Sequence, residues 1–193
     1  MKVVLATANP DKARELAGLL AGVEVTTAPE GFDVEETGTT LFQNAMMKAE
    51  ALRGVADPEA LVVADDTGLF VRALGGRPGV FSARYAGPGA TYADNCHRLL
   101  EELDGVADRR ASFATVLVGI AADGELVIAE GSCPGWIAPA PRGDGGFGYD
   151  PVFVPLGDER TMAEMTAAEK AAISHRGRAA RRLAAAIQPR PSA

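Results

Sequence analysis

Leu61-Val62-Val63-Ala64-Asp65-Asp66-Thr67-Gly68 is the stretch from which the fold and the chemistry of this chain are best approached. Its short apolar run is typical of a buried strand, and Gly68 permits a sharp exit from that strand. Because side chains alternate along a strand, one aspartate points toward the core edge and the other stays at the strand's mouth. Like charges this close repel unless a cation or hydrogen-bond donors compensate, so the pair predicts a divalent metal or a raised pKa.

The length and composition of the chain are those of a soluble globular protein. At 193 residues the chain is at the upper end of one ordinary domain, and we expect a single domain with two lobes over residues 1–193. A net charge of −7 disfavours a nucleic-acid surface but still permits a small phosphate ligand in a basic cleft. Without a signal sequence or a segment long enough to span a membrane, the chain is expected to be cytoplasmic. Cys96 and Cys133 have no paired spacing, which favours reduced thiols.

Lysine is scarce in this chain. Of the 19 basic residues only four are lysines, Lys2, Lys12, Lys48 and Lys170, and the others are arginines. In a chain that uses arginine by default, each interior lysine needs a reason, and a compact ammonium suits a point contact with a phosphate. Random variation among surface cations explains any one of them equally well.

The predicted elements alternate strands with helices and then form a late hairpin. Strands are expected over Lys2–Thr7, Val23–Thr27, Leu61–Asp65, Leu69–Arg72, Ser112–Ala121 and Glu125–Glu130, the last two forming a hairpin around Asp123-Gly124. Helices are expected from Pro10 to about Leu20, from Thr40 to about Arg53, from about Tyr92 to Leu103, after Thr166, and over Arg178–Ile187. Loops are expected over Pro29–Thr39 and Pro134–Pro155, with a frayed tail at Pro189–Ala193. This order predicts an α/β fold with a mixed sheet.

The first strand-to-helix turn, Thr7-Ala8-Asn9-Pro10-Asp11-Lys12, is a candidate anion site. Backbone N–H groups and the helix dipole favour an anion at a helix start. The positive charge of Lys12 is unfavourable in a first helical turn unless a phosphate is nearby. The glycine spacing of a Walker loop is absent, and plain capping by Asn9 is an alternative that stays open.

Three further segments carry candidate ligands. Glu35-Glu36-Thr37-Gly38 is a solvated charge run unless its loop folds toward Asp66, where a glutamate could complete a magnesium shell. Phe147-Gly148-Tyr149-Asp150-Pro151 suits either a stacked base, with Asp150 accepting from ring N–H groups, or an aromatic-anchored turn. Ser174-His175-Arg176 opens the last helix, where an arginine opposes the dipole and suggests an anionic or carbonyl ligand. A Ser/His/Asp hydrolase is disfavoured because no nucleophile elbow exists.

Taken in order, these segments resemble the inosine/xanthosine triphosphate pyrophosphatases, a family that removes non-standard purine nucleotides. No single segment is decisive, but the ordered set is specific and spans nearly the whole chain. The matching segments are Thr7-Ala8-Asn9 with Lys12, Glu35-Glu36-Thr37-Gly38, Asn44-Ala45, Asp65-Asp66-Thr67-Gly68, Gly75-Gly76-Arg77-Pro78-Gly79, Ser82-Ala83-Arg84-Tyr85, Gly145-Gly146-Phe147-Gly148-Tyr149-Asp150-Pro151, Glu169-Lys170 and Ser174-His175-Arg176.

The resemblance implies an elongated α/β fold with a long mixed sheet flanked by helices, an active-site cleft between two lobes, and a homodimer. It implies Mg²⁺-dependent hydrolysis of ITP, dITP or XTP to the monophosphate and pyrophosphate, with no nucleic-acid or membrane partner. Asp66 would be the catalytic carboxylate and a metal ligand together with Glu35, for which Glu36 is the alternative. The implied substrate contacts are Thr7, Ala8, Asn9, Pro10, Asp11, Lys12, Thr67, Phe147, Gly148, Tyr149, Asp150, Lys170, His175 and Arg176.

This chemistry suits the residues. Attack on the α–β phosphoanhydride needs charge neutralisation by Mg²⁺ and lysine together with a positioned water, for which Asp66 is either the base or a metal ligand. A buried donor such as His175 or Arg176 would match the six-position carbonyl of hypoxanthine or xanthine and mismatch adenine. Two alternatives remain, a related pyrophosphatase for modified pyrimidine or methylated guanine triphosphates, and a non-catalytic nucleotide sensor. The intact Asp65-Asp66 pair disfavours the sensor.

Overall fold

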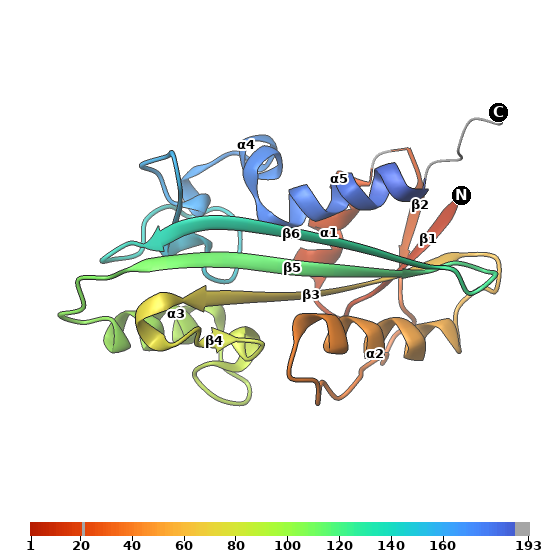
Figure 1. Ribbon diagram of the computed structural model, residues 1–193, viewed down its shortest axis with the longest axis horizontal. Helices are drawn as coiled ribbons and strands as arrows, with labels where there is room; N and C mark the ends of the chain where they lie inside the picture. The colour runs from red at the N-terminus through yellow and green to blue at the C-terminus, as the bar shows by residue number, and fades with distance from the viewer. Residues whose placement is uncertain (21, 188–193) are drawn as a thin grey trace. The chain divides into compact units, whose positions relative to one another are not determined.

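The computed structural model describes residues 1–20 and 22–187, so the predicted fraying of Pro189–Ala193 lies outside the described residues. The α-helices described are α1 (Pro10–Leu19), α2 (Leu41–Arg53), α3 (Tyr92–Glu102), α4 (Ala167–Ile173) and α5 (His175–Ile187), as labelled in Figure 1. The strands are β1 (Lys2–Ala6), β2 (Glu24–Thr27), β3 (Leu61–Val71), β4 (Pro78–Gly79), β5 (Arg110–Ile120), β6 (Leu126–Ile137) and β7 (Phe153–Pro155). None of the helices described is long and apolar enough to cross a membrane.

The strands form one mixed sheet. Over the described residues it has seven strands in the order β2-β1-β3-β5-β6-β7, with β4 paired to β3. The strands β2, β1 and β3 run parallel, whereas β4 is antiparallel to β3 and β7 is antiparallel to β6. The predicted α/β fold with a mixed sheet is confirmed.

The chain divides into two compact units. The first unit comprises Met1–Asp66, Thr115–Gly131 and the residues from Arg176 onward, and the second comprises Thr67–Ala114 and Ser132–His175. Three strands, β3, β5 and β6, contribute residues to both units. The candidate site residues are therefore described unit by unit.

The first unit is built on parallel strands covered on both faces. Val3 of β1 and Val63 of β3 share a core with Leu16 of α1 and Leu183 of α5. The helix α2 lies on the opposite face of these strands from α1 and α5 (Figure 1). Strands covered on both faces are apolar throughout rather than alternating, which explains the unbroken run Leu61–Ala64.

The second unit has its own core, in which α3 packs against the sheet. Leu99 of α3, Phe113 of β5 and Phe153 of β7 belong to this core. Cys96 and Cys133 lie in the same core as free thiols. Phe113 and Phe153 form a tilted aromatic pair with ring centroids 4.7 Å apart, which ties β5 to β7.

The strand β3 corrects one prediction. It was expected to end at Asp65 and to resume at Leu69, but it runs unbroken from Leu61 to Val71. The reason is the role of Gly68, where a Cβ atom would lie 2.7 Å from the carbonyl oxygen of Gly79. Glycine at this position lets β4 approach β3 closely and does not end the strand. The two aspartates consequently lie within a strand and not at its mouth.

The predicted loop Pro134–Pro155 is the second correction, because it contains the end of β6 and all of β7. The proline, glycine and aromatic residues of this stretch predicted a loop. A Cβ atom on Gly135 would lie 2.2 Å from the carbonyl oxygen of Val154, so this glycine permits close pairing of β6 with β7. The last helix also begins earlier than Arg178, at His175.

Candidate functional site

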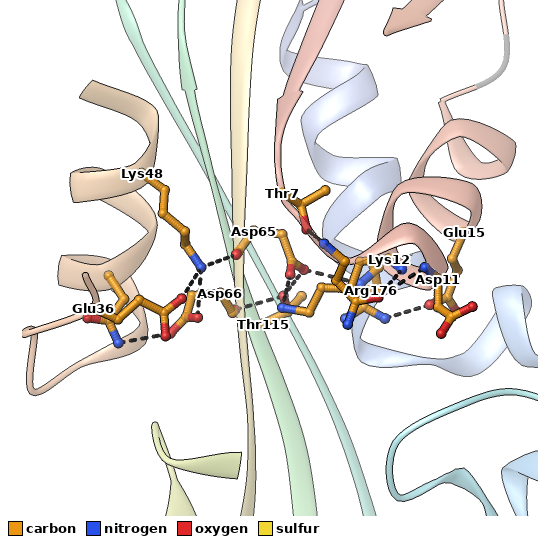
Figure 2. Close-up of polar contacts among 12 residues, drawn as sticks. Thr7, Asp11, Lys12, Glu15, Glu36, Lys48, Asp65, Asp66, Thr115 and Arg176 are labelled. Carbon is orange, nitrogen blue, oxygen red and sulfur yellow. Dashed lines mark hydrogen bonds and ion pairs between the residues drawn. The ribbon is translucent and has the colours of Figure 1, made fainter. Parts of the chain in front are cut away.

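Asp65 and Asp66 leave β3 on opposite faces, because neighbouring side chains alternate along a strand. Figure 2 shows the Asp65 carboxylate directed toward Lys12 and Arg176, and the Asp66 carboxylate directed toward Lys48 of α2. Both aspartates are buried, with exposed fractions of 2% and 5%. Each carboxylate is met by its own set of cations, so the two like charges are compensated separately.

Asp65 is held by two cations and a hydroxyl group. The Lys12 ammonium lies 2.5 Å from Oδ1, while Arg176 Nε and the Thr115 hydroxyl donate to Oδ2 at 3.1 and 2.9 Å. Arg176 is itself only 2% exposed, and its Nη1 donates to Glu15 at 2.5 Å. Burial raises the pKa of Asp65, but the charges of Lys12 and Arg176 outweigh burial and hold that pKa well below its usual range. Asp65 is therefore an anion at any physiological pH.

Asp66 shares the Lys48 ammonium with Glu36. Lys48 Nζ donates to Asp66 Oδ1 at 3.0 Å, to Glu36 Oε1 at 2.7 Å and to the backbone oxygen of Asp65 at 2.7 Å. The Asn44 side-chain amide donates to Asp66 Oδ2 at 3.3 Å. Burial raises the pKa of Asp66, Lys48 offsets this rise only in part, and the charge of Glu36 adds to it. A raised pKa was one of the two outcomes predicted for the acidic pair.

The oxygens around Lys48 are of the type that Mg²⁺ prefers. In proteins Mg²⁺ is commonly bound by one or two carboxylates, with waters and substrate phosphate oxygens completing its shell. Asp66 and Glu36 supply two carboxylates that converge on a single cation, so the donor set fits. Within residues 1–20 and 22–187 no group of three or more His, Cys, Asp or Glu side chains could hold a metal. A metal held by Asp66 and Glu36 would therefore complete its shell with waters or substrate oxygens.

Of the two glutamates that were candidates for this shell, Glu36 is the one beside Asp66. Glu36 is half-buried and reaches Asp66 through Lys48, whereas Glu35 is exposed. The acidic loop folds toward the aspartate pair, as a magnesium shell would require, but it brings Glu36 rather than Glu35 close to Asp66. Exposure alternates from one residue to the next over residues 33–38, so only one of the two adjacent glutamates faces inward.

Capping accounts for the N–H groups at the start of α1. Asn9 Oδ1 accepts from the backbone N–H groups of Asp11 and Lys12 at 3.0 and 3.2 Å. The Asn9 N–H in turn donates to Thr7 Oγ1 at 3.1 Å. Capping by Asn9, the alternative to an anion site, therefore accounts for these N–H groups. Phosphate binding by Thr7–Lys12 stays a prediction.

Lys12 has an anion beside it, which compensates for the unfavourable position of a positive charge in a first helical turn. That anion is the Asp65 carboxylate. Ala8 and Pro10, also predicted as substrate contacts, are exposed. A ligand reaching this turn would therefore meet side chains and exposed backbone rather than the capped N–H groups.

The second unit holds a separate cluster around Asp150. Asp150 Oδ2 accepts from Lys170 Nζ at 2.6 Å and from the Phe147 N–H at 2.8 Å. Lys170 Nζ also lies 4.7 Å from the centroid of the Phe147 ring, which is a cation–π contact. Asp150 and Lys170 are 3% and 7% exposed. A buried ion pair beside a half-buried aromatic ring can offer both a donor and an acceptor to a planar ligand.

The other predicted contacts of this unit are mostly buried. The Tyr149 hydroxyl donates to the backbone oxygen of Ser82 at 2.8 Å, so this tyrosine anchors the aromatic segment. The buried His175 ring stacks on Phe113, with centroids 4.6 Å apart and planes inclined by 14°. Thr67 is half-buried and follows Asp66 in β3.

Some site residues were missed by the sequence prediction. Lys48, which was not assigned to the site, completes the surroundings of Asp66 together with Glu36, the stated alternative to Glu35, and the scarcity of lysine was the signal for Lys48. Glu15 and Thr115, which complete the surroundings of Asp65 and Arg176, carried no signal. Arg176 was predicted as a donor to the base, but its described contacts are with carboxylates of the first unit.

Comparisons with known proteins agree along the whole chain. Residues 3–186 match the model of the Ham1 family. The dITP/XTP pyrophosphatase of Geobacillus kaustophilus is 49% identical over 190 residues, which cover 94% of this chain and 92% of that protein. That of Escherichia coli O157:H7 is 47% identical over 195 residues, covering 97% and 98%. The solved structure of the Staphylococcus aureus Ham1 protein matches with a TM-score of 0.85 at 38% identity, covering 97% of this chain and 98% of that one.

Proposed function

Because the chain belongs to the Ham1 family, we propose that it hydrolyses non-standard purine nucleoside triphosphates to the monophosphate and pyrophosphate. Two relatives named dITP/XTP pyrophosphatase, nearly half identical over almost their full length, support this substrate class. The structural observation that carries the proposal is Asp66, a buried carboxylate with a raised pKa beside Lys48 and Glu36. A raised pKa makes this carboxylate a stronger base than an ordinary one, in a site rich in compensating charge.

We propose that Asp66 takes the proton of the attacking water. The water oxygen forms a bond to the α-phosphorus, the bond from the α-phosphorus to the bridging oxygen breaks, and pyrophosphate leaves with that electron pair. The proton released by the water passes to Asp66 Oδ1 or Oδ2. A carboxylate with an ordinary pKa is a weak base at neutral pH, so the rise in the pKa of Asp66 without metal favours this role for the oxygen that Mg²⁺ would leave free.

Asp66 and Glu36 are the residues proposed to hold Mg²⁺. Bound there, Mg²⁺ would neutralise phosphate charge and polarise a phosphoryl oxygen. Lys48 contacts both carboxylates, so it keeps them together and limits their mutual repulsion. Two carboxylates would leave most of the Mg²⁺ shell open for waters and substrate oxygens, in agreement with the usual way in which Mg²⁺ binds nucleotides in proteins.

Lys12 and Lys48 are the proposed phosphate contacts of the first unit. Their side chains are 19% and 12% exposed, whereas that of Arg176 is 2% exposed and directed to Asp65 and Glu15. The two lysines are therefore the more accessible positive charges. Arg176 is better suited to keeping Asp65 ionised and in place, because both of its described contacts are with buried or partly buried carboxylates.

Base selection is proposed for the Asp150 cluster of the second unit. Hypoxanthine and xanthine present a carbonyl at position six and an N–H at position one, which match the Lys170 ammonium and the Asp150 carboxylate. Adenine presents an amino donor and a bare ring nitrogen instead, so both buried charges would lose a partner. Phe147 supplies an aromatic face for stacking. The homodimer, the cytoplasmic location, the single domain and the cleft between lobes stay predictions from the sequence.

The direct test is pyrophosphate release across a panel of ITP, dITP, XTP, GTP, ATP and dTTP, with and without Mg²⁺. We expect release from the first three, dependent on Mg²⁺, and little release from ATP. A preference for dTTP would support the alternative of a pyrophosphatase for modified pyrimidine nucleotides. Binding of ITP without any release of pyrophosphate would identify a nucleotide sensor instead.

A further inference from the structure

Tyr92, which has no part in the proposed reaction, places its ring against the ring of Phe147. The ring centroids are 5.9 Å apart and the planes are inclined by 44°, within the range of favourable tilted aromatic pairs. Tyr92 is 40% exposed and Phe147 is half-buried. The pair therefore presents aromatic surface to solvent beside the Asp150 cluster.

The start of α3 fixes the backbone of Tyr92. Thr91 is the N-cap, and its Oγ1 accepts from the Asp94 N–H at 3.2 Å. Asp94 Oδ2 accepts from the Thr91 N–H at 2.8 Å, which completes a capping box. Tyr92 is the first residue of the helix that this box opens. Its ring is thus carried by an ordered helix start and not by a loop.

The same face of α3 meets two successive residues of the aromatic segment. Tyr92 and Cys96 are four residues apart, so they lie on one side of the helix. The Cys96 thiol donates to the Gly148 carbonyl at 3.4 Å, while Tyr92 contacts the Phe147 ring. The contact of Tyr92 is accordingly part of the packing of α3 against this segment.

Phe147 is also held by two charged groups. Its N–H donates to Asp150 Oδ2, and the Lys170 ammonium lies over its ring. Lys170 is in turn fixed by Asp150 at 2.6 Å. Asp150 and Lys170 restrain the backbone and one face of the ring, and Tyr92 supplies the aromatic contact that restrains it further.

We propose that Tyr92 is a positioning residue for the nucleobase, because it orients the Phe147 ring and enlarges the aromatic surface offered to a purine. The inference rests on the proposed function in one respect, that Phe147 receives the base. Stacking on aromatic side chains tolerates changes of base. Tyr92 should therefore strengthen base affinity without choosing among purines, and the choice is left to Asp150 and Lys170.

The test compares the binding of two probes, inosine monophosphate and inorganic tripolyphosphate, to the full chain by calorimetry without Mg²⁺, so that no hydrolysis is expected. Tyr92→Ala and Tyr92→Leu are expected to weaken inosine monophosphate by about 3- to 10-fold, the range of an aromatic pair. Tyr92→Phe, which keeps the ring, should bind like the wild type. Tripolyphosphate has no base, so its affinity should be the same in all of them. Phe81→Ala, a change at another exposed aromatic residue of the second unit, is the control and should leave both affinities unchanged.

The possible outcomes separate this inference from the proposed function. Equal affinity of the wild type and Tyr92→Leu for inosine monophosphate would overturn the inference about Tyr92. A parallel loss of tripolyphosphate binding would also overturn it, as would a wild type that does not bind inosine monophosphate. Leucine keeps apolar volume and helix propensity, so this variant decides the matter if Tyr92→Ala fails to fold. A wild type that binds inosine monophosphate through Tyr92, yet releases no pyrophosphate from ITP, would refute the proposed function alone.

Discussion

The carboxylates of Asp65 and Asp66 are neighbours in the chain, yet their pKa values move in opposite directions. Burial raises the pKa of both. On the face of Asp65 the charges of Lys12 and Arg176 more than reverse that effect, whereas on the face of Asp66 Lys48 is shared with Glu36 and the rise persists. One residue is kept as a structural anion and its neighbour is left able to take up a proton.

The opposite shifts can be measured directly in the protein without added metal. Following the side-chain carboxyl carbons by NMR during a pH titration, we expect Asp66 to titrate above the ordinary value of about 3.9 and Asp65 well below it. Glu36→Gln should lower the midpoint of Asp66, because the charge of Glu36 contributes to its rise. Coincident titration of the two aspartates would contradict the separation of their environments.

The two aspartates should make the free energy of unfolding depend on pH with opposite signs. A carboxyl whose pKa is depressed on folding adds stability above its unfolded pKa, and that stability is lost as the pH falls through the folded value. Asp65 should therefore protect the protein down to below about pH 4. For Asp66 the raised pKa adds stability at low pH, which is lost as the pH rises through the folded value. Urea unfolding at a series of pH values should show the difference between the wild type and Asp65→Asn shrinking in acid, and a difference that stays constant would refute the assignment.

Asp65→Asn should destabilise the fold strongly at neutral pH. Removing one partner of a buried ion pair leaves the other charge uncompensated and typically costs about 3–5 kcal/mol. The midpoint of urea unfolding is the measurement. Asp108→Asn is the matched control, since it breaks the exposed pair with Arg110 and should cost far less. A comparable loss in both variants would argue against the buried network.

Glu36 and Glu35 provide an internal test of the metal assignment. Glu36→Gln should raise the Mg²⁺ concentration needed for half-maximal pyrophosphate release about tenfold or more. Glu35→Gln should leave it near the wild-type value, because Glu35 is exposed. The reverse order would show that the acidic loop uses the other glutamate.

Gly146 tests the Asp150 cluster. A Cβ atom there would lie 2.1 Å from Asp150 Oδ2, and the glycine has a φ of +69°. Gly146→Ala should therefore displace the carboxylate that holds Lys170 and raise KM for ITP. Gly157→Ala has the same backbone strain, with a φ of +92°, but no atom within 4 Å of the added carbon. Similar KM values for these two alanine variants would show that Asp150 does not contact the base.

Much of this molecule could be predicted from the sequence, and the failures share a cause. Apolar periodicity and capping signals located the helices and the parallel strands, because those patterns are local. Gly68 was taken as the end of its strand and Gly135 as part of a loop, whereas each lies in a strand where another backbone approaches closely. Whether a glycine turns the chain or lets a second strand approach depends on a partner distant in sequence.

Prediction of the candidate site was limited in the same way, by partners that are distant in sequence. Asp66 and the Asp150 segment could be located from local pattern, and the scarcity of lysine drew attention to Lys12, Lys48 and Lys170, each of which contacts a carboxylate in one of the two clusters. The partner of Arg176 could not be predicted, since Glu15 lies 161 positions away in the chain. The choice between adjacent glutamates also required the structure, because it depends on which way an extended loop is turned.

The central claim is that Asp66 activates the water that attacks the triphosphate, and a single-turnover measurement of pyrophosphate release from ITP tests it most directly. Asp66→Asn keeps the size of the side chain and removes the base, so release should slow by about 10²- to 10⁴-fold while the affinity for inosine monophosphate is retained. Release at a rate near that of the wild type would contradict the account.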